Sequence, residues 1–425
     1  MSESIRLVRT PGPPTGTFAP DDAQRAVIAH DRGHLRVLAG PGTGKTSVIV
    51  AAAQRRIAAG QAAGELLLLT YGRMAAQELR ERLTVGDQPV PVATTFHALA
   101  YRLLLADEPG LRLMGGPEQE AVLREIVRST SHLPSALEVA RDSRGLTDQL
   151  RAFIAQAQSR RLPPATTRGD DPVSRAAAAI YAEYLDVTAL AATMDYSELI
   201  RRATGLLRQA PPESVRRLRT IFVDEYQDTD PAQVSFLREL AAHGAQIIAV
   251  GDPDQSIYGF RGADAEGILR FDDEFAMPSC RTITLSQTRR YGPQIAQVVA
   301  RVVPRNALGS IPARQVQTHR SPSAVGASGM VAFRCYESEA AQAEHIADLL
   351  RRVQAGTSEV FSGLQVDWSQ MAVLVRSAAR DLPTLQRALS ASGVPVEIVR
   401  DDLPVAKSPA VRPLLELLRA AANVD

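Results

Sequence analysis

The sequence predicts an α/β fold built on a parallel sheet, and three stretches lead to this prediction. Residues 35–39 (LRVLA) are an apolar run of strand length, followed by a glycine-rich loop and by a helical pattern over residues 46–60. Residues 220–223 (TIFV) and 247–250 (IIAV) are further short apolar runs, and each ends in a polar loop. Strands that alternate with helical segments are typical of βα units whose strands lie parallel in one sheet.

The bulk composition is that of a globular protein. The chain has 425 residues, of which 45% are hydrophobic and 22% charged, so we expect two or three domains and neither disorder nor a membrane protein. The formal net charge of +1 gives no overall basic field, so a polyanion would have to meet local arginine patches. Nucleic-acid binding is neither shown nor excluded by this balance.

The two cysteines and the N-terminus indicate the cellular compartment. Cys280 and Cys335 have no CxxC spacing and no histidine neighbours, which argues against a zinc site or a disulfide framework and fits a reducing cytoplasm. The N-terminus has no apolar signal region, and no stretch approaches the roughly 18 consecutive apolar residues of a spanning helix. We therefore expect a soluble cytoplasmic protein without a membrane partner.

Residues 39–46 read AGPGTGKT and predict a phosphate-binding loop. Lys45 is one of two lysines in an arginine-rich chain, and its compact ammonium group can reach between two phosphates where a guanidinium would not fit. Strand, glycine loop and helix in this order are the context in which backbone N–H groups bind phosphate oxygens. We expect nucleotide contacts from Ala39, Gly40, Pro41, Gly42, Thr43, Gly44, Lys45, Thr46 and Ser47.

Within this loop, Lys45 would contact the β- and γ-phosphates and Thr46 would hold Mg²⁺. Ala39 stands where the strict pattern has its first glycine. A simple glycine turn between a strand and a helix is the alternative interpretation.

Two acids follow the second apolar run. Asp224 and Glu225 lie at its carboxyl end, and ligands of parallel α/β sheets bind at those strand ends. Asp224 is placed to bind Mg²⁺ through water, and Glu225 to activate an attacking water as general base. The alternative is a solvated acidic turn, which the pairing with a phosphate loop disfavours.

The loop after the third run repeats this logic with different side chains. Gln255 both donates and accepts hydrogen bonds, which suits a side chain that senses a γ-phosphate or its bound water. Tyr258 and Phe260 follow it, and aromatic rings in a loop suit base stacking better than core packing. The alternative is that both rings are ordinary core residues.

Taken in order, these and four further stretches resemble the N-terminal part of a UvrD/Rep/PcrA-type DNA helicase of superfamily 1. Seven family motifs occur in sequence order: FAPDDAQRAV, AGPGTGKT, LLLLTYGRMAAQELRERL, ATTFHALA, VDEYQDTD, GDPDQSIYGFRGA and LSQTRRYGPQI. The resemblance implies an ATP-dependent 3′-to-5′ single-strand translocase and helicase with ATP and Mg²⁺ as cofactors. It also implies work in DNA repair or recombination, such as the processing of double-strand breaks, with single-stranded DNA and duplex ends as partners.

The resemblance also implies roles for individual residues. Gln24 would read the adenine, Gln255 would couple the γ-phosphate to motion, and Arg290 would reach the γ-phosphate from a second motor domain. Lys45, Thr46, Asp224 and Glu225 would do the phosphate and magnesium work. The residues in segments that line the single-strand path are Tyr71, Phe96, Tyr258 and Phe260, with Thr95 and His97 as candidate backbone contacts.

Two departures from the family pattern concern the adenine pocket. The family usually has N-Y-R where this chain has Thr288, Arg289 and Arg290, and often an arginine where it has Ser47. Arg289 could still stack through its guanidinium plane. The alternative function is therefore a nucleotide- and DNA-binding scaffold subunit, with weak ATPase of its own, in a heteromeric helicase-nuclease.

The unusual motif around Arg290 also makes the chain look like a motor subunit, of the AdnA type, of an actinobacterial AdnAB-type helicase-nuclease, which would have a second subunit as partner. A stand-alone UvrD-like repair helicase is the competing placement. Motifs V and VI of the family are not found after residue 295, so we expect an incomplete chain.

The resemblance implies a domain order. It gives a first RecA-like motor domain over 1–105 and 190–285, a helical insertion over 106–189, the start of a second RecA-like domain over 286–400 and the start of another helical insertion over 401–425. Strand, helix and strand are expected over 370–399, and a polar loop without periodicity over 306–329.

A loop over 159–172 is expected within the first insertion. Its arginines, Arg160, Arg161 and Arg168, either meet DNA phosphates or form a solvated face.

Overall fold

The computed structural model describes residues 18–84, 89–160, 162–191, 193–259, 263–264, 266–275, 280–303, 308, 311–361 and 363–398. Contacts divide the chain after residue 329 into two units. The domain bounds expected from the sequence stay a prediction, and the one over 401–425 lies outside the described residues.

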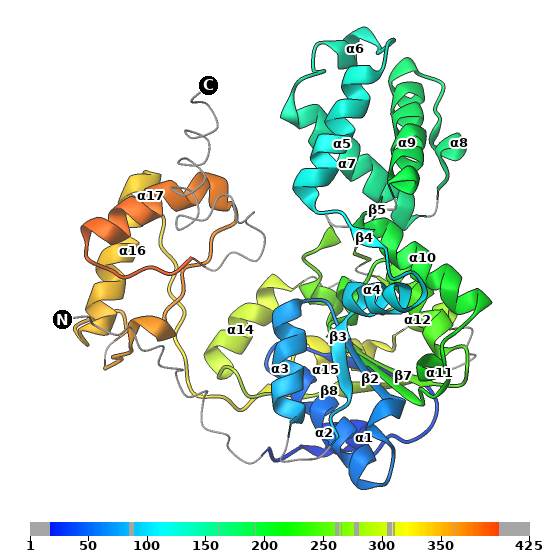
Figure 1. The fold of residues 1–425 in the computed structure, drawn as a ribbon. Helices are drawn as coiled ribbons and strands as arrows, with labels where there is room; N and C mark the ends of the chain where they lie inside the picture. The colour runs from blue at the N-terminus through cyan, green and yellow to red at the C-terminus, as the bar shows by residue number, and fades with distance from the viewer. Residues whose placement is uncertain are drawn as a thin grey trace, which may run out of the picture. The chain divides into compact units, whose positions relative to one another are not determined.

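The first unit is organised around a six-stranded parallel sheet (Figure 1). Its strands, in spatial order, are β3 (Val92–Thr95), β2 (Leu66–Thr70), β6 (Thr220–Val223), β7 (Gln246–Gly251), β1 (Leu35–Ala39) and β8 (Arg281–Leu285). Four of them, β1, β2, β6 and β7, are apolar almost throughout because helices cover both faces of the sheet. The predicted α/β fold with a parallel sheet is confirmed, with the strand before the P-loop and the strand before Asp224 in one sheet.

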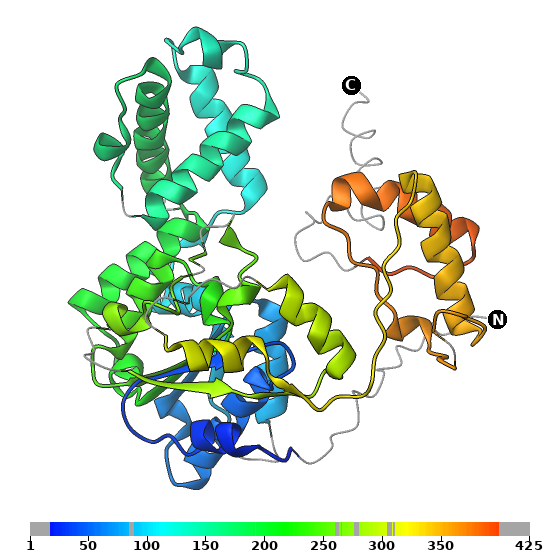
Figure 2. The ribbon, with the colours of Figure 1, turned by 180° about the vertical axis from the view of Figure 1, so that it is seen from behind.

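Two hydrophobic cores lie on the two faces of this sheet. One core contains side chains of α1 (Asp22–Ile28), α2 (Lys45–Ala58) and α3 (Arg73–Leu83). The other contains side chains of α4 (Phe96–Asp107), α10 (Tyr196–Gln209) and α12 (Pro231–Ala241). The same layers are visible from behind in Figure 2. Short helical turns complete this unit: η1 (Ala63–Glu65), α11 (Glu213–Arg216), η2 (Tyr226–Asp228), η3 (Pro253–Gln255) and α13 (Phe271–Glu274).

A helical insertion with its own core lies between α4 and α10. It consists of α5 (Gly116–Ser129), α6 (Ser135–Glu138), α7 (Arg144–Ser159), α8 (Pro164–Thr167) and α9 (Pro172–Leu190). The chain segments that lead into and out of the insertion pair as a two-stranded parallel ladder, β4 (Arg112–Leu113) with β5 (Thr193–Met194). The segment expected as a loop over 159–172 contains the single-turn helix α8, which Pro164 starts at its first position.

Residues after β8 add further elements to the first unit. These are β9 (Gln287–Thr288), α14 (Pro293–Val302), α15 (Ala313–Arg320) and β10 (Ser323–Ala324), which pairs with β9. The expectation of a polar loop without regular structure over 306–329 is wrong for α15. Its sequence, ARQVQTHR, has almost no apolar periodicity, and side-chain contacts to the loop after β7 hold the helix instead.

The described part of the second unit contains two long helices and a helical turn. They are α16 (Glu339–Gln354), η5 (Trp368–Gln370) and α17 (Ala378–Ala391). α16 and α17 share a small core with Val394. The residues expected as strands on either side of α17 are not paired in the described part of this unit, and Leu374 is 93% exposed. A strand needs a neighbour for its backbone hydrogen bonds.

Candidate nucleotide-binding site

The loops predicted to bind nucleotide lie at one edge of the sheet. The P-loop follows β1, the acidic pair follows β6, and the loop with Gln255 follows β7. Because β6, β7 and β1 are neighbouring parallel strands, their carboxyl ends meet at the same edge. The segment after β8, which pairs with the other side of β1, brings Thr288, Arg289 and Arg290 to that edge as well.

The P-loop has the backbone shape that its glycines permit. Gly42 and Gly44 have φ values of 73° and 88°, in the left-handed region. A Cβ at Gly42 would lie 2.3 Å from Cβ of Arg290, so no other residue fits there without a shift. The loop runs directly into α2, whose first residue is Lys45. Backbone N–H groups at this helix N-terminus favour an anionic ligand such as phosphate.

Lys45 and Thr46 each contact one of the two predicted acids. Lys45 Nζ lies 3.2 Å from Oε2 of Glu225, and Thr46 Oγ1 donates to Oδ2 of Asp224 at 3.0 Å. Burial, together with the charge of Glu225, raises the pKa of Asp224 to about 6. A hydroxyl and a carboxylate that already touch fit the oxygen ligands that Mg²⁺ prefers. Four predicted residues therefore lie together, although their roles stay predictions.

Glu225 has an unusual backbone for a glutamate. Its φ of 52° and ψ of 48° make it the one non-glycine residue with positive φ in the described part of the chain. Such a conformation costs energy and is found most often at functional sites. Gln227 holds the Glu225 carboxylate through a 2.8 Å hydrogen bond from Nε2 to Oε2. The carboxylate is thus fixed at the edge beside Lys45.

Gln24 and the residues after β8 both contact the P-loop. The Gln24 amide donates to the carbonyl of Thr43 at 2.9 Å and takes part in a capping box with Asp21. Arg289 donates its backbone N–H to Gly42 at 3.0 Å, and its side chain lies 3.3 Å from Asp21. Gln24 and Arg289 therefore lie close to each other beside the loop, since both contact Asp21.

Gln255 is held inside its own loop. Its backbone N–H bonds to the Asp252 carbonyl, and its side-chain amide donates to the Asp252 carboxylate. Asp252 is 2% exposed, so Gln255 is anchored by a buried acid.

The residues predicted to line a DNA path are placed differently from one another. Tyr71 and Tyr258 are stacked, with ring centroids 4.8 Å apart and an interplanar angle of 24°. Phe96 is 2% exposed and belongs to the core, so it presents no face to a base in this structure. Phe260, like Arg161 of the insertion, lies outside the described residues.

Thr95 and His97 also have structural partners. Thr95 is the N-cap of α4 and accepts a hydrogen bond from the Ala98 N–H at 3.2 Å. His97 packs against Tyr196 with ring centroids 5.7 Å apart, and burial lowers its pKa to about 4. A neutral His97 at pH 7 offers a phosphate a hydrogen bond at most and no charge.

The structure adds residues to this site that the sequence analysis missed. Arg82 of α3 donates to the Ser47 hydroxyl at 2.7 Å, next to the P-loop. Asp228 is buried with one carboxylate oxygen unpartnered among the described atoms, and burial with the charge of Glu225 raises its pKa to about 6. Gln227 and Asp228 stand in the same motif as Glu225 and could have been noted there. Arg82 also stands in a quoted motif, LLLLTYGRMAAQELRERL, but it lies 35 positions from Ser47, and nothing in the sequence links the two residues.

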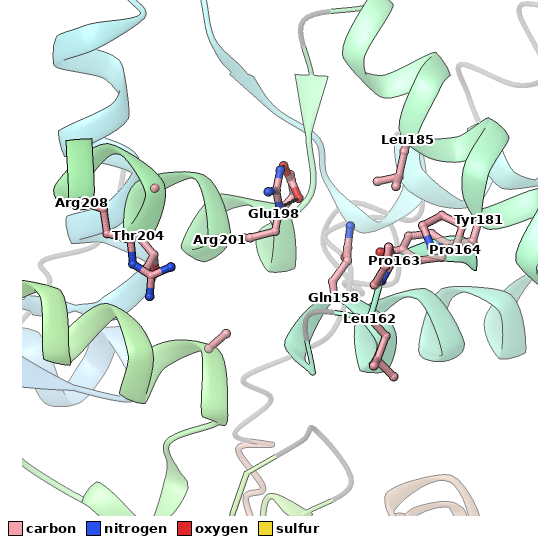
Figure 3. A pocket seen from close by; sticks show the side chains of 12 residues that line it. Gln158, Leu162, Pro163, Pro164, Tyr181, Leu185, Glu198, Arg201, Thr204 and Arg208 are labelled. Atoms are coloured by element: carbon pink, nitrogen blue, oxygen red, sulfur yellow. Dashed lines mark hydrogen bonds and ion pairs between the residues drawn. The ribbon is translucent and has the colours of Figure 1, made fainter. Parts of the chain in front are cut away.

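The cavity drawn in Figure 3 lies away from these residues. It has a volume of about 540 Å³ and is lined by residues of α7, α9, α10 and α12 and by the turn at Pro163 and Pro164. None of its lining residues belongs to the predicted nucleotide or DNA set. Arg201 and Arg208, which face it, are already paired with Glu198 and Glu239. The cavity marks the junction between the insertion and the rest of the first unit.

Comparisons with known proteins agree with the motif order. The UvrD/REP helicase N-terminal domain family matches residues 21–276. ATP-dependent DNA helicase UvrD1 of Mycobacterium leprae is 30% identical over 433 residues, which cover 94% of this chain and 52% of the relative. ATP-dependent DNA helicase UvrD2 of Mycobacterium tuberculosis is 28% identical over 89% of this chain and 55% of the relative.

DNA helicase II of Salmonella typhimurium is 31% identical over 67% of this chain and 40% of its own length. The chain thus spans about half the length of the curated relatives it matches. These relatives give no support to the AdnAB-type placement or to a second subunit. No helix in the described part of the chain is long and apolar enough to cross a membrane.

Proposed function

The chain belongs to the UvrD/REP helicase family, and on this premise we propose that it binds MgATP at the carboxyl edge of its sheet as part of an ATP-dependent DNA helicase. The observation that supports the proposal most is the pairing of Lys45 with Glu225 and of Thr46 with Asp224. It joins a glycine loop with phosphate-binding shape to two acids 178 positions or more away in the sequence.

Each residue at the edge has a chemical task in this proposal. Thr46 and Asp224 would hold Mg²⁺, which would supply neutralisation of the phosphate charge. Lys45 moves from Glu225 to the β- and γ-phosphates, which frees the Glu225 carboxylate to accept a proton from the attacking water. Gln24 and Arg289 contact the base, and Gln255 and Arg290 contact the γ-phosphate.

We further propose that single-stranded DNA passes over the stacked pair of Tyr71 and Tyr258. Base stacking on aromatic rings is tolerant of sequence because every base has a π-face, which suits a translocating motor. Tyr258 lies three positions after Gln255, so a movement of Gln255 with the nucleotide state would reach the ring. Movement in the 3′-to-5′ direction, a role in DNA repair or recombination, and single-stranded DNA and duplex ends as substrates complete the proposal.

A scaffold role with weak ATPase remains the second candidate. It is favoured by two positions of the proposed adenine pocket that depart from the family pattern. The Ser47 hydroxyl accepts a hydrogen bond from Arg82, and the Thr288 hydroxyl donates one to the carbonyl of Pro41 at 2.8 Å. Nucleotide binding without DNA-stimulated turnover, in a form of the protein with all family motifs, would support this second candidate.

The nucleotide site is tested by removing Lys45. Lys45→Ala is expected to weaken MgATPγS binding by about tenfold or more, since a charge-assisted contact of about 1.5–3 kcal/mol is lost. Isothermal titration calorimetry of the 425-residue chain measures it. Lys407→Ala, which removes the other lysine of the chain, is the control and should bind as the wild type does. Equal affinity in both variants would contradict the proposed site.

A further inference from the structure

The last turn of α15 is joined to the loop that carries Gln255. His319 Nε2 lies 3.0 Å from Oδ1 of Asp252 and 3.6 Å from Oδ2 of Asp254. Arg320 donates to both carboxylate oxygens of Asp254 at 2.8 Å. His319 is 3% exposed, so this contact is made inside the protein. None of the seven family motifs includes His319 or Arg320.

The carboxylate of Asp252 contacts both His319 and Gln255 and so links the two side chains. One oxygen of the Asp252 carboxylate faces His319, and the other accepts from the side-chain amide of Gln255. The first oxygen also accepts the backbone N–H of Asp254 at 3.0 Å, which shapes the turn. The orientation of Gln255 therefore depends on a carboxylate that His319 holds from the opposite side.

The same aspartate is connected to the candidate general base. The backbone N–H of Asp252 donates to Oε1 of Gln227 at 2.9 Å, and Gln227 in turn donates to Glu225 at 2.8 Å. Gln227 is 1% exposed, and a Cβ at Gly251 would lie 2.6 Å from its Oε1, so the amide has little room to move. A continuous chain of hydrogen bonds thus leads from α15 to the edge residues.

Charge complementarity stabilises the arrangement. Although burial opposes its charged form, the hydrogen bonds to Asp252 and Asp254 raise the pKa of His319 to about 9, so it is cationic at pH 7. The pairing with His319 and Arg320 lowers the pKa of Asp254 to about 2 against the effect of its burial. Two carboxylates and two cations therefore face one another, while Nδ1 of His319 is buried without a hydrogen-bond partner among the described atoms. The donor types of Asp252, Asp254 and His319 would also suit a metal ion, but Arg320 already occupies both oxygens of Asp254.

α15 also contacts the P-loop itself. A Cβ built at Gly40 would lie 3.4 Å from the carbonyl oxygen of His319. The end of α15 therefore lies against the phosphate loop on one side and against the Gln255 loop on the other. A shift of the backbone in one of these loops would therefore displace His319, and His319 would displace the other loop.

We propose that His319 is a positioning residue that holds Asp252, and through it Gln255, in the orientation that distinguishes ATP from ADP. The inference rests on the proposed nucleotide site and adds a residue to it. His319 touches no nucleotide itself, and it acts by fixing the carboxylate that orients the Gln255 amide.

The test compares affinities for MgATPγS and MgADP in the 425-residue chain by isothermal titration calorimetry. His319→Ala is expected to reduce the preference for MgATPγS over MgADP about fivefold or more, the usual lower range of coupling between sites. His319→Gln, which keeps a hydrogen-bond donor near the Nε2 position, should restore part of the preference. His243→Ala, which removes an exposed histidine after α12, should leave it unchanged.

A mutant cycle separates positioning from packing. If His319 acts through Gln255, adding His319→Ala to Gln255→Ala should lower the preference no further than Gln255→Ala alone. A purely structural His319 would lower the melting temperature while the preference stays as in the wild type, and this result would overturn the inference. So would an equal loss of affinity for both nucleotides. If the alanine variant does not fold, the nucleotide preference of His319→Gln, the less disruptive variant, tests the inference instead.

Nucleotide binding by the wild-type protein distinguishes a failure of the inference from a failure of the proposed function. If the wild type binds neither nucleotide, the proposed site is overturned and the inference with it. If binding depends on Lys45 but the preference does not depend on His319, the site stands and only the inference is overturned.

Discussion

Two buried aspartates of the first unit show how differently the protein uses the same side chain. Asp195, between the insertion and α10, has its carboxylate saturated. One oxygen accepts the Glu198 N–H at 2.8 Å, and the other accepts from Tyr184, Gln158 and Gln119 at 2.7, 3.2 and 3.4 Å. These three donors come from α9, α7 and α5, so one acid joins the three long helices of the insertion to the N-terminus of α10.

Asp224, at the sheet edge, is equally buried but has only two hydrogen-bond donors among the described residues. They are the Thr46 hydroxyl at 3.0 Å and the backbone N–H of Glu225 at 3.1 Å. Burial raises its pKa to about 6, which means that the protein alone does not fully stabilise its charge. A saturated buried acid contributes to stability, whereas an undersatisfied one beside a phosphate loop is suited to a ligand.

The largest expected effect comes from the edge. Glu225→Gln should leave MgATP binding close to that of the wild type and lower hydrolysis by about 10²–10⁴, the usual contribution of a general base. Turnover is measured in a form of the protein with detectable DNA-stimulated ATPase. Glu239→Gln, which alters a partly buried partner of Arg208 away from the sheet edge, is the matched control. Unchanged turnover in Glu225→Gln would remove the role assigned to this carboxylate.

The next effect distinguishes the two aspartates directly. Asp195→Ala should lower the free energy of unfolding by about 3 kcal/mol, because it leaves buried donors unpaired and removes the cap of α10. Urea unfolding measures it, and Asp148→Ala, an exposed acid of the insertion paired with Arg151, should change it by about 0.5 kcal/mol at most.

The counterpart of this prediction is Asp224→Asn. It should cost less than about 1 kcal/mol of stability, since it relieves a poorly satisfied charge, but it should abolish the Mg²⁺ dependence of nucleotide binding. The comparison fails if Asp224→Asn destabilises the fold as much as Asp195→Ala does.

Two tyrosines give the smallest expected effect. Tyr258→Ala should cost about 1 kcal/mol of affinity for a single-stranded oligonucleotide, at the low end for a stacked base because Tyr71 remains. Fluorescence anisotropy at several salt concentrations should show an unchanged salt slope, since no phosphate contact is lost. Tyr184→Phe removes the hydroxyl that bonds to Asp195 at 2.7 Å, so it should lower stability and leave DNA affinity unchanged. If Tyr258→Ala lowers stability and leaves DNA affinity unchanged, Tyr258 is a core residue and not a stacking residue.

The sheet edge was largely predictable from sequence because its chemistry demands particular residues at short spacing. Gly42 and Gly44 need positive φ, Lys45 must begin the helix, and Asp224 and Glu225 must end a strand. Such requirements leave local patterns that can be read without a structure. The helices of the insertion were predictable for a similar reason, since apolar residues at helical spacing form their core.

What the sequence alone determined is therefore the α/β class, the order of the βα units and the residues of the P-loop and the acidic pair. Only the tertiary structure decided that Phe96 is a core residue, that Arg82 reaches Ser47, and that α15 is a helix bonded to Asp252 and Asp254. The physical reason is the distance along the chain. His319 meets Asp252 across 67 positions, through hydrogen bonds and charges that leave no periodic pattern in the segment that carries them.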